Sequence, residues 1–139
     1  MPAPAPTASS ALRERYWLSG FLFLRSLGLI YFIAFLGLTQ QAPPLIGSDG
    51  LLPARRYLDA VASARGDRLS AFLEEPTVFW VDSSDTSLSA MAYVGLTLSA
   101  VVTLGFANAP LLAILWVLYL SFVHVGLLFY GYGWEILLL

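Results

Sequence analysis

The sequence predicts an all-α membrane protein with three transmembrane helices, the start of a fourth, and short amphipathic helices in the loop between the first two. Hydrophobic residues make up 58% of the 139 residues and charged residues only 12%, which is about half the charged fraction of an ordinary soluble domain. The mean hydropathy is +0.76. This composition excludes a soluble globular domain, and it excludes intrinsic disorder over most of the length.

Residue usage also excludes several classes of site. The chain has no cysteine, so it contains no disulfide and no thiolate metal site. Its single histidine cannot form a histidine cluster for a metal, and we expect neither a metal nor a cofactor. Seven basic residues against nine acidic ones give a net charge of −2, which leaves no basic surface for nucleic acid. The expected partner is the lipid bilayer.

The first element is a tail followed by a long apolar segment. We expect residues 1–15 to form a flexible tail, because alternating proline and alanine at its start disfavour a helix. Residues 17–39 carry a single charge, Arg25, and are long enough to cross about 30 Å of hydrocarbon. Residues 42–44 (Ala-Pro-Pro) are expected to end this first span.

Two further spans follow at residues 88–106 and 110–130, neither of which contains an acidic residue, lysine or arginine. The short connection at residues 107–109 predicts a tight antiparallel hairpin between them, and Pro110 suits the first turn of the third helix. Residues 131–139 combine glycines with a final apolar run. We expect them to begin a fourth helix in a longer protein.

The loop over residues 40–87 is the only long polar region. One helical pattern runs from Pro53 to about residue 64, with Gly66 as its C-cap, and a second runs from Asp67, its N-cap, to about residue 75. Residues 82–85 supply an N-cap for the second span. Both helical patterns are amphipathic, which favours contact with the membrane interface over a small lid packed on the bundle. Arg13 and Arg15 flank the first span, so the tail is expected on the cytoplasmic side and the loop outside.

Arg25 is the strongest candidate functional residue, because a charge near the centre of a span costs about 2.5–3.5 kcal/mol. It lies roughly 12 Å along the helix from Trp17, at 1.5 Å per residue. One interpretation is an anchor for a carboxylate, a lipid headgroup or a polar cavity. The favoured alternative is a structural pair or a side chain that extends to the interface.

The remaining polar candidates are Asp49, His124 and Glu135. Asp49 lies in a Ser-Asp-Gly turn, and Glu135 is placed near the far membrane interface. His124 follows Ser121 by one turn with no acid nearby in the sequence, which favours a neutral histidine bonded to a neighbouring helix over a catalytic residue. A face of small residues on the second span predicts close helix packing. It consists of Ala92, Gly95, Ser99 and Thr103.

Three stretches resemble the N-terminal membrane region of the lipase maturation factor family. They are FLRSLGLIY at residues 23–31, LIGSDGLLPARR at residues 45–56, and LYLSFVHVG at residues 118–126 followed by FYGYGWEILLL at residues 129–139. The resemblance covers nearly everything after residue 15. It implies a polytopic membrane protein, distantly similar to the membrane part of vitamin K-dependent carboxylase.

The resemblance also implies a function. In animals the family lies in the endoplasmic reticulum membrane and helps secreted lipases to fold and assemble, so the implied partners are further helices of the full-length protein and a secreted lipase or other client. The arginine-only, alanine-rich composition indicates a bacterial source, and hence the bacterial inner membrane. Two alternatives remain open: a helical membrane module of an enzyme, and a structural subunit of a membrane complex.

Overall fold

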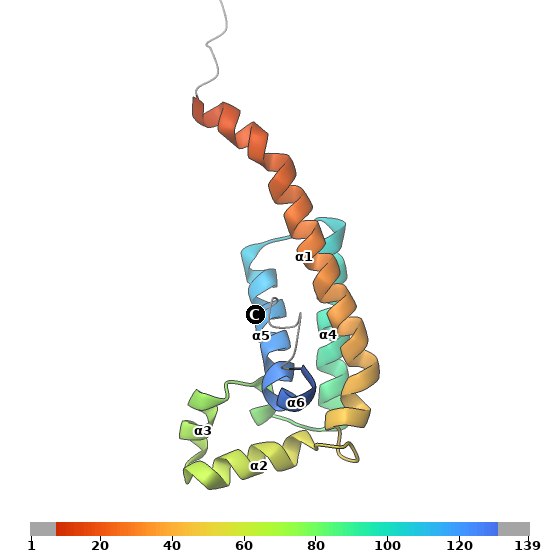
Figure 1. The fold of residues 1–139 in the computed structure, drawn as a ribbon, viewed down its shortest axis with the longest axis vertical. Helices are drawn as coiled ribbons and strands as arrows, with labels where there is room; N and C mark the ends of the chain where they lie inside the picture. Colours follow the sequence, from red (N-terminus) through yellow and green to blue (C-terminus); the bar gives the residue numbers. More distant parts are fainter. Residues whose placement is uncertain (1–7, 131–139) are drawn as a thin grey trace, which may run out of the picture.

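The computed structural model describes residues 8–130, and within that range the chain is helical and has no strands, as the sequence predicts. In chain order the elements are α1 (Ala8–Ile46), α2 (Ala54–Arg65), α3 (Arg68–Glu74), the 3-10 helix η1 (Val78–Trp80), α4 (Asp85–Leu104), α5 (Ala109–Val125) and α6 (Leu127–Tyr130). α1, α4 and α5 run side by side, while α2 lies crosswise at one end of this bundle with α3 beside it (Figure 1).

Two helices are long and apolar enough to cross a membrane: residues Tyr16–Ile46 of α1 and Asp85–Leu104, which is α4. The 20 residues of α4 correspond to about 30 Å at 1.5 Å per residue, the thickness of the hydrocarbon core. α5 is apolar but has only 17 residues. The two spans therefore have support from length and composition, whereas the expected third span does not reach that length.

The third helix ends at Gly126 and does not continue to residue 130. The Gly126 backbone (φ −101°, ψ 20°) leaves the helical conformation, and α6 follows. The Tyr130 ring then packs where a β-carbon on residue 126 would stand. The expectation of one helix over 110–130 is thus wrong at its last turn, because Gly126 permits Tyr130 to fold back onto the end of α5.

The first helix is longer than expected at both ends. It begins at Ala8, so residues 8–15 of the expected flexible tail are helical, and it continues past Pro43 and Pro44 to Ile46. The prolines lack the N–H groups that would bond to the carbonyls of Thr39 and Gln40, so those two helix bonds are absent near its end. Fully buried side chains on either side of the prolines, Ala42 and Ile46, hold this last turn in the fold. The Gly47 N–H donates to the carbonyl of Pro43 at 3.0 Å.

α1 and α4 form the most extensive helix–helix contact of the described chain. α4 and α5 also contact each other across the short connection at residues 105–108, but less extensively. A β-carbon on Gly28 would lie 2.8 Å from the backbone nitrogen of Thr103, so the two backbones approach closely. Farther along, the Phe35 ring occupies the space beside Gly95. Both contacts use the small-residue face of α4, where Ala92 and Ser99 are also fully buried.

These contacts fix an antiparallel register. Arg25 lies at the end of α4, Gly28 at Thr103 and Phe35 at Gly95. The part of α1 alongside α4 is therefore residues 25–46, and the expected span over residues 17–39 lies within the longer apolar segment Tyr16–Ile46. The preceding part of α1 projects beyond the bundle (Figure 1). Its large apolar side chains are exposed: Tyr16, Trp17, Leu18, Phe21, Leu22 and Phe23.

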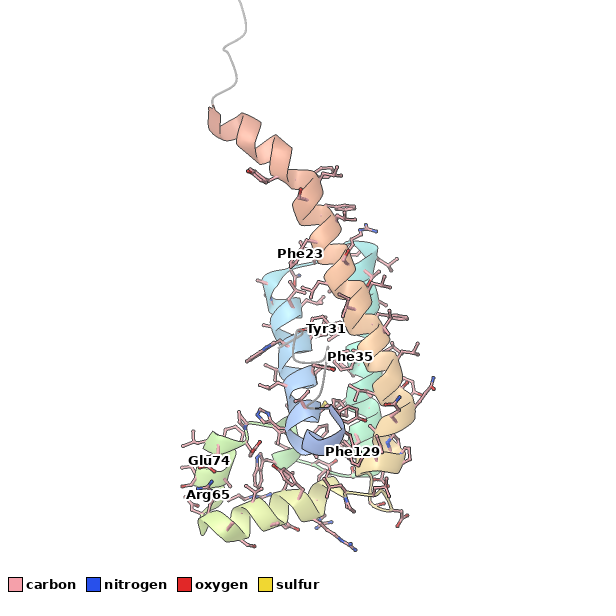
Figure 2. All side chains as sticks on the ribbon, viewed as in Figure 1. Phe23, Tyr31, Phe35, Arg65, Glu74 and Phe129 are labelled. Atoms are coloured by element: carbon pink, nitrogen blue, oxygen red, sulfur yellow. The ribbon has the colours of Figure 1, made fainter. Side chains whose placement is uncertain are left out.

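Aromatic side chains join α5 to this helix pair. Tyr31 and Phe35 point from α1 toward α5 (Figure 2). Tyr119 of α5 meets both rings edge-on, with ring centroids 6.0 Å from Tyr31 and 5.8 Å from Phe35. All three side chains are buried, and edge-to-face pairs of this kind add stability beyond burial. α5 is therefore placed by aromatic packing rather than by a small-residue contact.

The close contact at Gly28 predicts the effect of an added methyl group. Gly28→Ala should lower the free energy of unfolding by about 1–3 kcal/mol, because the new β-carbon overlaps the α4 backbone. Gly37→Ala in the same helix is the matched control, since no atom lies within 4 Å of its β-carbon position. Unfolding by sodium dodecyl sulfate in mixed micelles measures both. Equal stability of the two variants would contradict the close approach of α1 and α4.

Candidate functional site

The loop between α1 and α4 folds into an ordered unit at one end of the bundle. Ala54 and Leu58 of α2 are buried against the bundle, while Arg55, Arg56 and Asp59 are exposed. α2 thus packs as a lid, which is the alternative that the sequence pattern did not favour. Its apolar side is already covered by protein.

The helix ends in this loop follow the expected capping residues. Gly66 adopts a left-handed conformation (φ 70°) and its N–H donates to the Ala62 carbonyl, which ends α2. The Leu69 N–H donates to the Asp67 side chain, which caps α3. Ser84 caps α4 by accepting from the Ser87 N–H at 3.2 Å. The short helices are therefore held in place by local hydrogen bonds.

Asp85 clamps the beginning of α4 to the end of α1. The Ser48 backbone N–H donates to Asp85 Oδ1 at 2.7 Å, and the Ser48 hydroxyl donates to Oδ2 at 2.6 Å. A carboxylate in the first turn of a helix is also favoured by the helix dipole. Asp49, the candidate residue in this turn, is exposed, and its neighbour Ser48 makes the contact instead.

An open groove of about 830 Å³ lies between α2 and residues 79–86. We refer to it as the loop groove. Its lining combines apolar and charged side chains of both signs. Among the lining residues are Ile46, Leu58, Phe79, Arg55, Asp59 and Asp82. Such a mixed lining suits a ligand that presents both apolar groups and hydrogen-bonding groups.

The wall of the groove is braced by Trp80 and two arginines. Arg68 donates to the Trp80 carbonyl at 3.1 Å and lies over the indole ring, 5.7 Å from its centroid. Trp80 Nε1 donates to the Glu75 carbonyl at 2.9 Å. Arg65 and Glu74 join α2 to α3 by an ion pair of 2.7 Å, and both residues can be followed in Figure 2.

His124 meets an acid that sequence spacing did not reveal. Its Nε2 lies 3.7 Å from Glu75 Oε2, and both side chains are about four-fifths buried, with 21% and 23% exposed. Within the described residues, His124 Nδ1 and Glu75 Oε2 are buried without a hydrogen-bond partner. Burial first, and then the Glu75 carboxylate nearby, raise the pKa of Tyr57. The phenol, the acid and the imidazole thus form one polar cluster where the loop meets α5.

Ser121, one turn before His124, has a structural role. Its hydroxyl donates to the Val117 carbonyl at 2.8 Å and accepts from the Val78 N–H at 3.1 Å. Its own carbonyl accepts from the Thr77 hydroxyl at 3.2 Å. Because the hydroxyl is occupied by these bonds, Ser121 and His124 do not form a nucleophile–base pair. These bonds attach η1 to α5.

Arg25 lies at the opposite end of the bundle, where it caps α4. Its guanidinium donates to the Leu104 carbonyl at 2.9 Å and lies 4.5 Å from the centroid of the Phe21 ring. The last carbonyls of a helix lack intrahelical partners and carry the negative end of its dipole. The partner of Arg25 is therefore a backbone carbonyl within this chain, and Arg25 lies at the end of the α1–α4 pair rather than near its middle.

The structure separates the candidate residues instead of gathering them. Arg25 and His124 lie near opposite ends of the bundle, Asp49 is in an exposed turn, and Glu135 lies outside the described residues. Two acids make the long-range polar contacts of the loop, Glu75 with His124 and Asp85 with Ser48, and neither acid was singled out as a site residue. Their partners are 49 and 37 positions away in the chain, and no local pattern indicates such pairs.

Comparison with known proteins identifies similar sequences. The family profile for the lipase maturation factor transmembrane domain matches residues 18–139. The chain is 43% identical over 126 residues to lipase maturation factor 1 of Bos taurus, covering 86% of this chain and 22% of that protein. It is 39% identical over 138 residues to lipase maturation factor 1 of Homo sapiens, covering 95% of this chain and 24% of that protein.

A more distant relative is lipase maturation factor 2 of Rattus norvegicus, 33% identical over 126 residues, with 85% of this chain and 17% of that protein covered. The chain thus spans less than a quarter of the length of these curated relatives. No solved structure matches the chain significantly.

The capping contact of Arg25 makes a prediction about charge. Arg25→Met should lower the free energy of unfolding by about 1–2 kcal/mol, because the Leu104 carbonyl loses its donor. Arg25→Glu should be worse, since it places a negative charge beside the carbonyl end of α4. Unfolding in mixed micelles measures both, with Arg56→Glu on the exposed side of α2 as the control. Recovery of Arg25→Glu by Glu135→Arg would instead indicate an acidic side chain as the partner.

Proposed function

The chain belongs to the lipase maturation factor family, and from that premise we propose that it is the membrane-embedded part of a factor that assists the folding or assembly of secreted proteins. The names of the relatives, lipase maturation factors 1 and 2, indicate that those proteins act in the maturation of lipases. Two apolar helices support a membrane location for this chain. Because the chain spans only part of those relatives, the activity of the full-length protein is part of the proposal.

The loop groove is the surface that we assign to the client. It is open, it lies on the unit that connects the two membrane-crossing helices, and its lining carries both apolar and charged groups. An unfolded or partly folded polypeptide presents the same mixture of apolar side chains and backbone hydrogen-bonding groups. The proposed action is binding without chemistry, and this is supported by the structural bonds that occupy the Ser121 hydroxyl.

The exposed apolar part of α1 fits the same proposal. Residues 16–23 present large apolar side chains beyond the level of the α4–α5 turn. When these side chains lie in the bilayer, the α4–α5 turn lies at membrane depth, where a polar loop is tolerated only if protein covers it. We assign this part of α1 to contact with the bilayer and with further helices of the full-length protein. The proposed location is the bacterial inner membrane, in keeping with the arginine-only composition.

The proposed orientation places the N-terminal end of α1 in the cytoplasm and the loop groove outside, where a secreted client is present. Because the chain has no cysteine, Ala60→Cys creates a single thiol on the exposed side of α2. A membrane-impermeant maleimide added to intact cells should label it. Labelling only after the cytoplasmic side is opened would contradict the orientation. It would place the groove in the cytoplasm, on the side of the membrane opposite to a secreted client.

The client role predicts different effects at two adjacent arginines. Arg55 lines the loop groove, whereas Arg56 is exposed on the same helix and lies outside its lining. In cells that depend on the full-length protein, Arg55→Glu should lower the specific activity of a secreted lipase about five-fold, equivalent to about 1 kcal/mol of client binding. Arg56→Glu should leave the activity unchanged.

Protein levels of both variants are compared by immunoblot, so that reduced activity is not confused with reduced abundance. Equal activity of the two variants, whether both high or both low, would contradict client binding in the groove.

A further inference from the structure

α3 is held in place by its polar groups and its smallest side chain. Ala71 is its fully buried residue. Asp67 caps its beginning, Glu74 pairs with Arg65 of α2, and the carbonyl of Glu75 at its end accepts from the Trp80 indole. This two-turn helix therefore has a fixed position that does not depend on packing of its large apolar residues.

Those large residues point outward. Leu69 is 66% exposed, Phe72 43% and Leu73 74%. Positions 69, 72 and 73 follow helical spacing and share one side of the helix. We refer to this surface as the apolar face of α3. A helix that buries alanine and exposes two leucines and a phenylalanine is oriented opposite to its neighbour α2, which buries Ala54 and Leu58.

The position of α3 indicates what covers this face. Figure 1 shows α3 to the side of the bundle end, between the level of α2, which lies crosswise at the very end, and the level of α6. The end of α3 contacts the last turn of α5 through Glu75 and His124. α3 thus lies at the end of a bundle whose helices carry exposed apolar side chains, in the manner of a bilayer-facing surface.

Charge around α3 agrees with a lipid environment. At the end of the helix, Glu74 is paired with Arg65, and Glu75 lies against His124 of α5. At the other end, Arg68 is exposed and lies next to Leu69 in sequence. Its bond to the Trp80 carbonyl uses one of the five guanidinium N–H donors, which leaves others for an anionic partner. An apolar face bordered by an arginine is typical of helices that lie at the boundary between headgroups and acyl chains, where the cation meets lipid phosphate.

We propose that the apolar face of α3, formed by Leu69, Phe72 and Leu73, inserts into the headgroup–acyl boundary of the bilayer and anchors the loop to the membrane surface. This anchoring fixes the depth of the loop unit relative to the bilayer. α2 contributes the water-facing side of the same unit, with Arg55, Arg56 and Asp59 directed away from lipid. The proposal is independent of any client, because it concerns the protein and lipids alone.

The absence of cysteine from these 139 residues permits a direct test once any cysteine elsewhere in the full-length protein has been replaced by serine. Leu73→Cys and, separately, Leu69→Cys are introduced into the full-length protein, labelled with the fluorophore NBD and reconstituted into vesicles of phosphatidylethanolamine and phosphatidylglycerol. Ser63→Cys on the exposed side of α2 is the matched control, since it lies on the same side of the membrane and in the same loop unit.

The expected result is bright, blue-shifted NBD emission at positions 69 and 73, with loss of intensity when part of the lipid carries a doxyl group near the top of its acyl chain. The position 63 probe should be dim, insensitive to doxyl lipid and quenched by iodide from the aqueous phase. If the probes at positions 69 and 73 behave like the control, the face lies in water in a client-free membrane. That outcome would overturn lipid anchoring and would assign the face to a protein partner.

Discussion

The close antiparallel contact of α1 with α4 is the constraint on which the rest of the structure depends. In a bilayer, apolar side chains gain little by leaving lipid for protein, so helices associate where small residues let backbones approach. Gly28 and Gly95 provide two such positions on opposite helices. Once these two contacts form, one register remains, and it brings Arg25 to the last carbonyl of α4 and Ser48 to Asp85 at the other end.

This register also determines where the loop can fold. With the end of α1 clamped to the beginning of α4, the intervening loop must start and finish at the same place and can only cover the end of the bundle. α2 closes that end with Ala54 and Leu58, and η1 attaches to α5 through the Ser121 hydroxyl. The loop groove results from this arrangement, because α2 and the first residues of α4 are held apart by the segment that contains Phe79 and Trp80.

Local patterns predicted the helices, the caps at Gly66 and Asp67, and the small-residue face of α4, because each depends on neighbours within one or two turns. They did not predict the end of α5 at Gly126, because that end depends on the Tyr130 ring packing against Gly126. They also did not indicate which part of α1 lies alongside α4, since hydropathy is nearly uniform from Trp17 to Leu38 and the contacts at Gly28 and Phe35 set the register. The pairs Glu75–His124 and Ser48–Asp85 join residues far apart in the chain, so tertiary structure alone reveals them.

The contact between Arg25 and Leu104 also imposes an order on biosynthesis. The two residues are 79 positions apart, so the guanidinium enters the membrane long before its acceptor has been synthesised. During that interval, α1 is a helix with an unsatisfied charge, and water or lipid phosphate must solvate that charge at the interface. The final depth of α1 is therefore set only when α4 arrives. By then the whole loop has been translated, so the groove and the helix pair that frames it are completed in the same step.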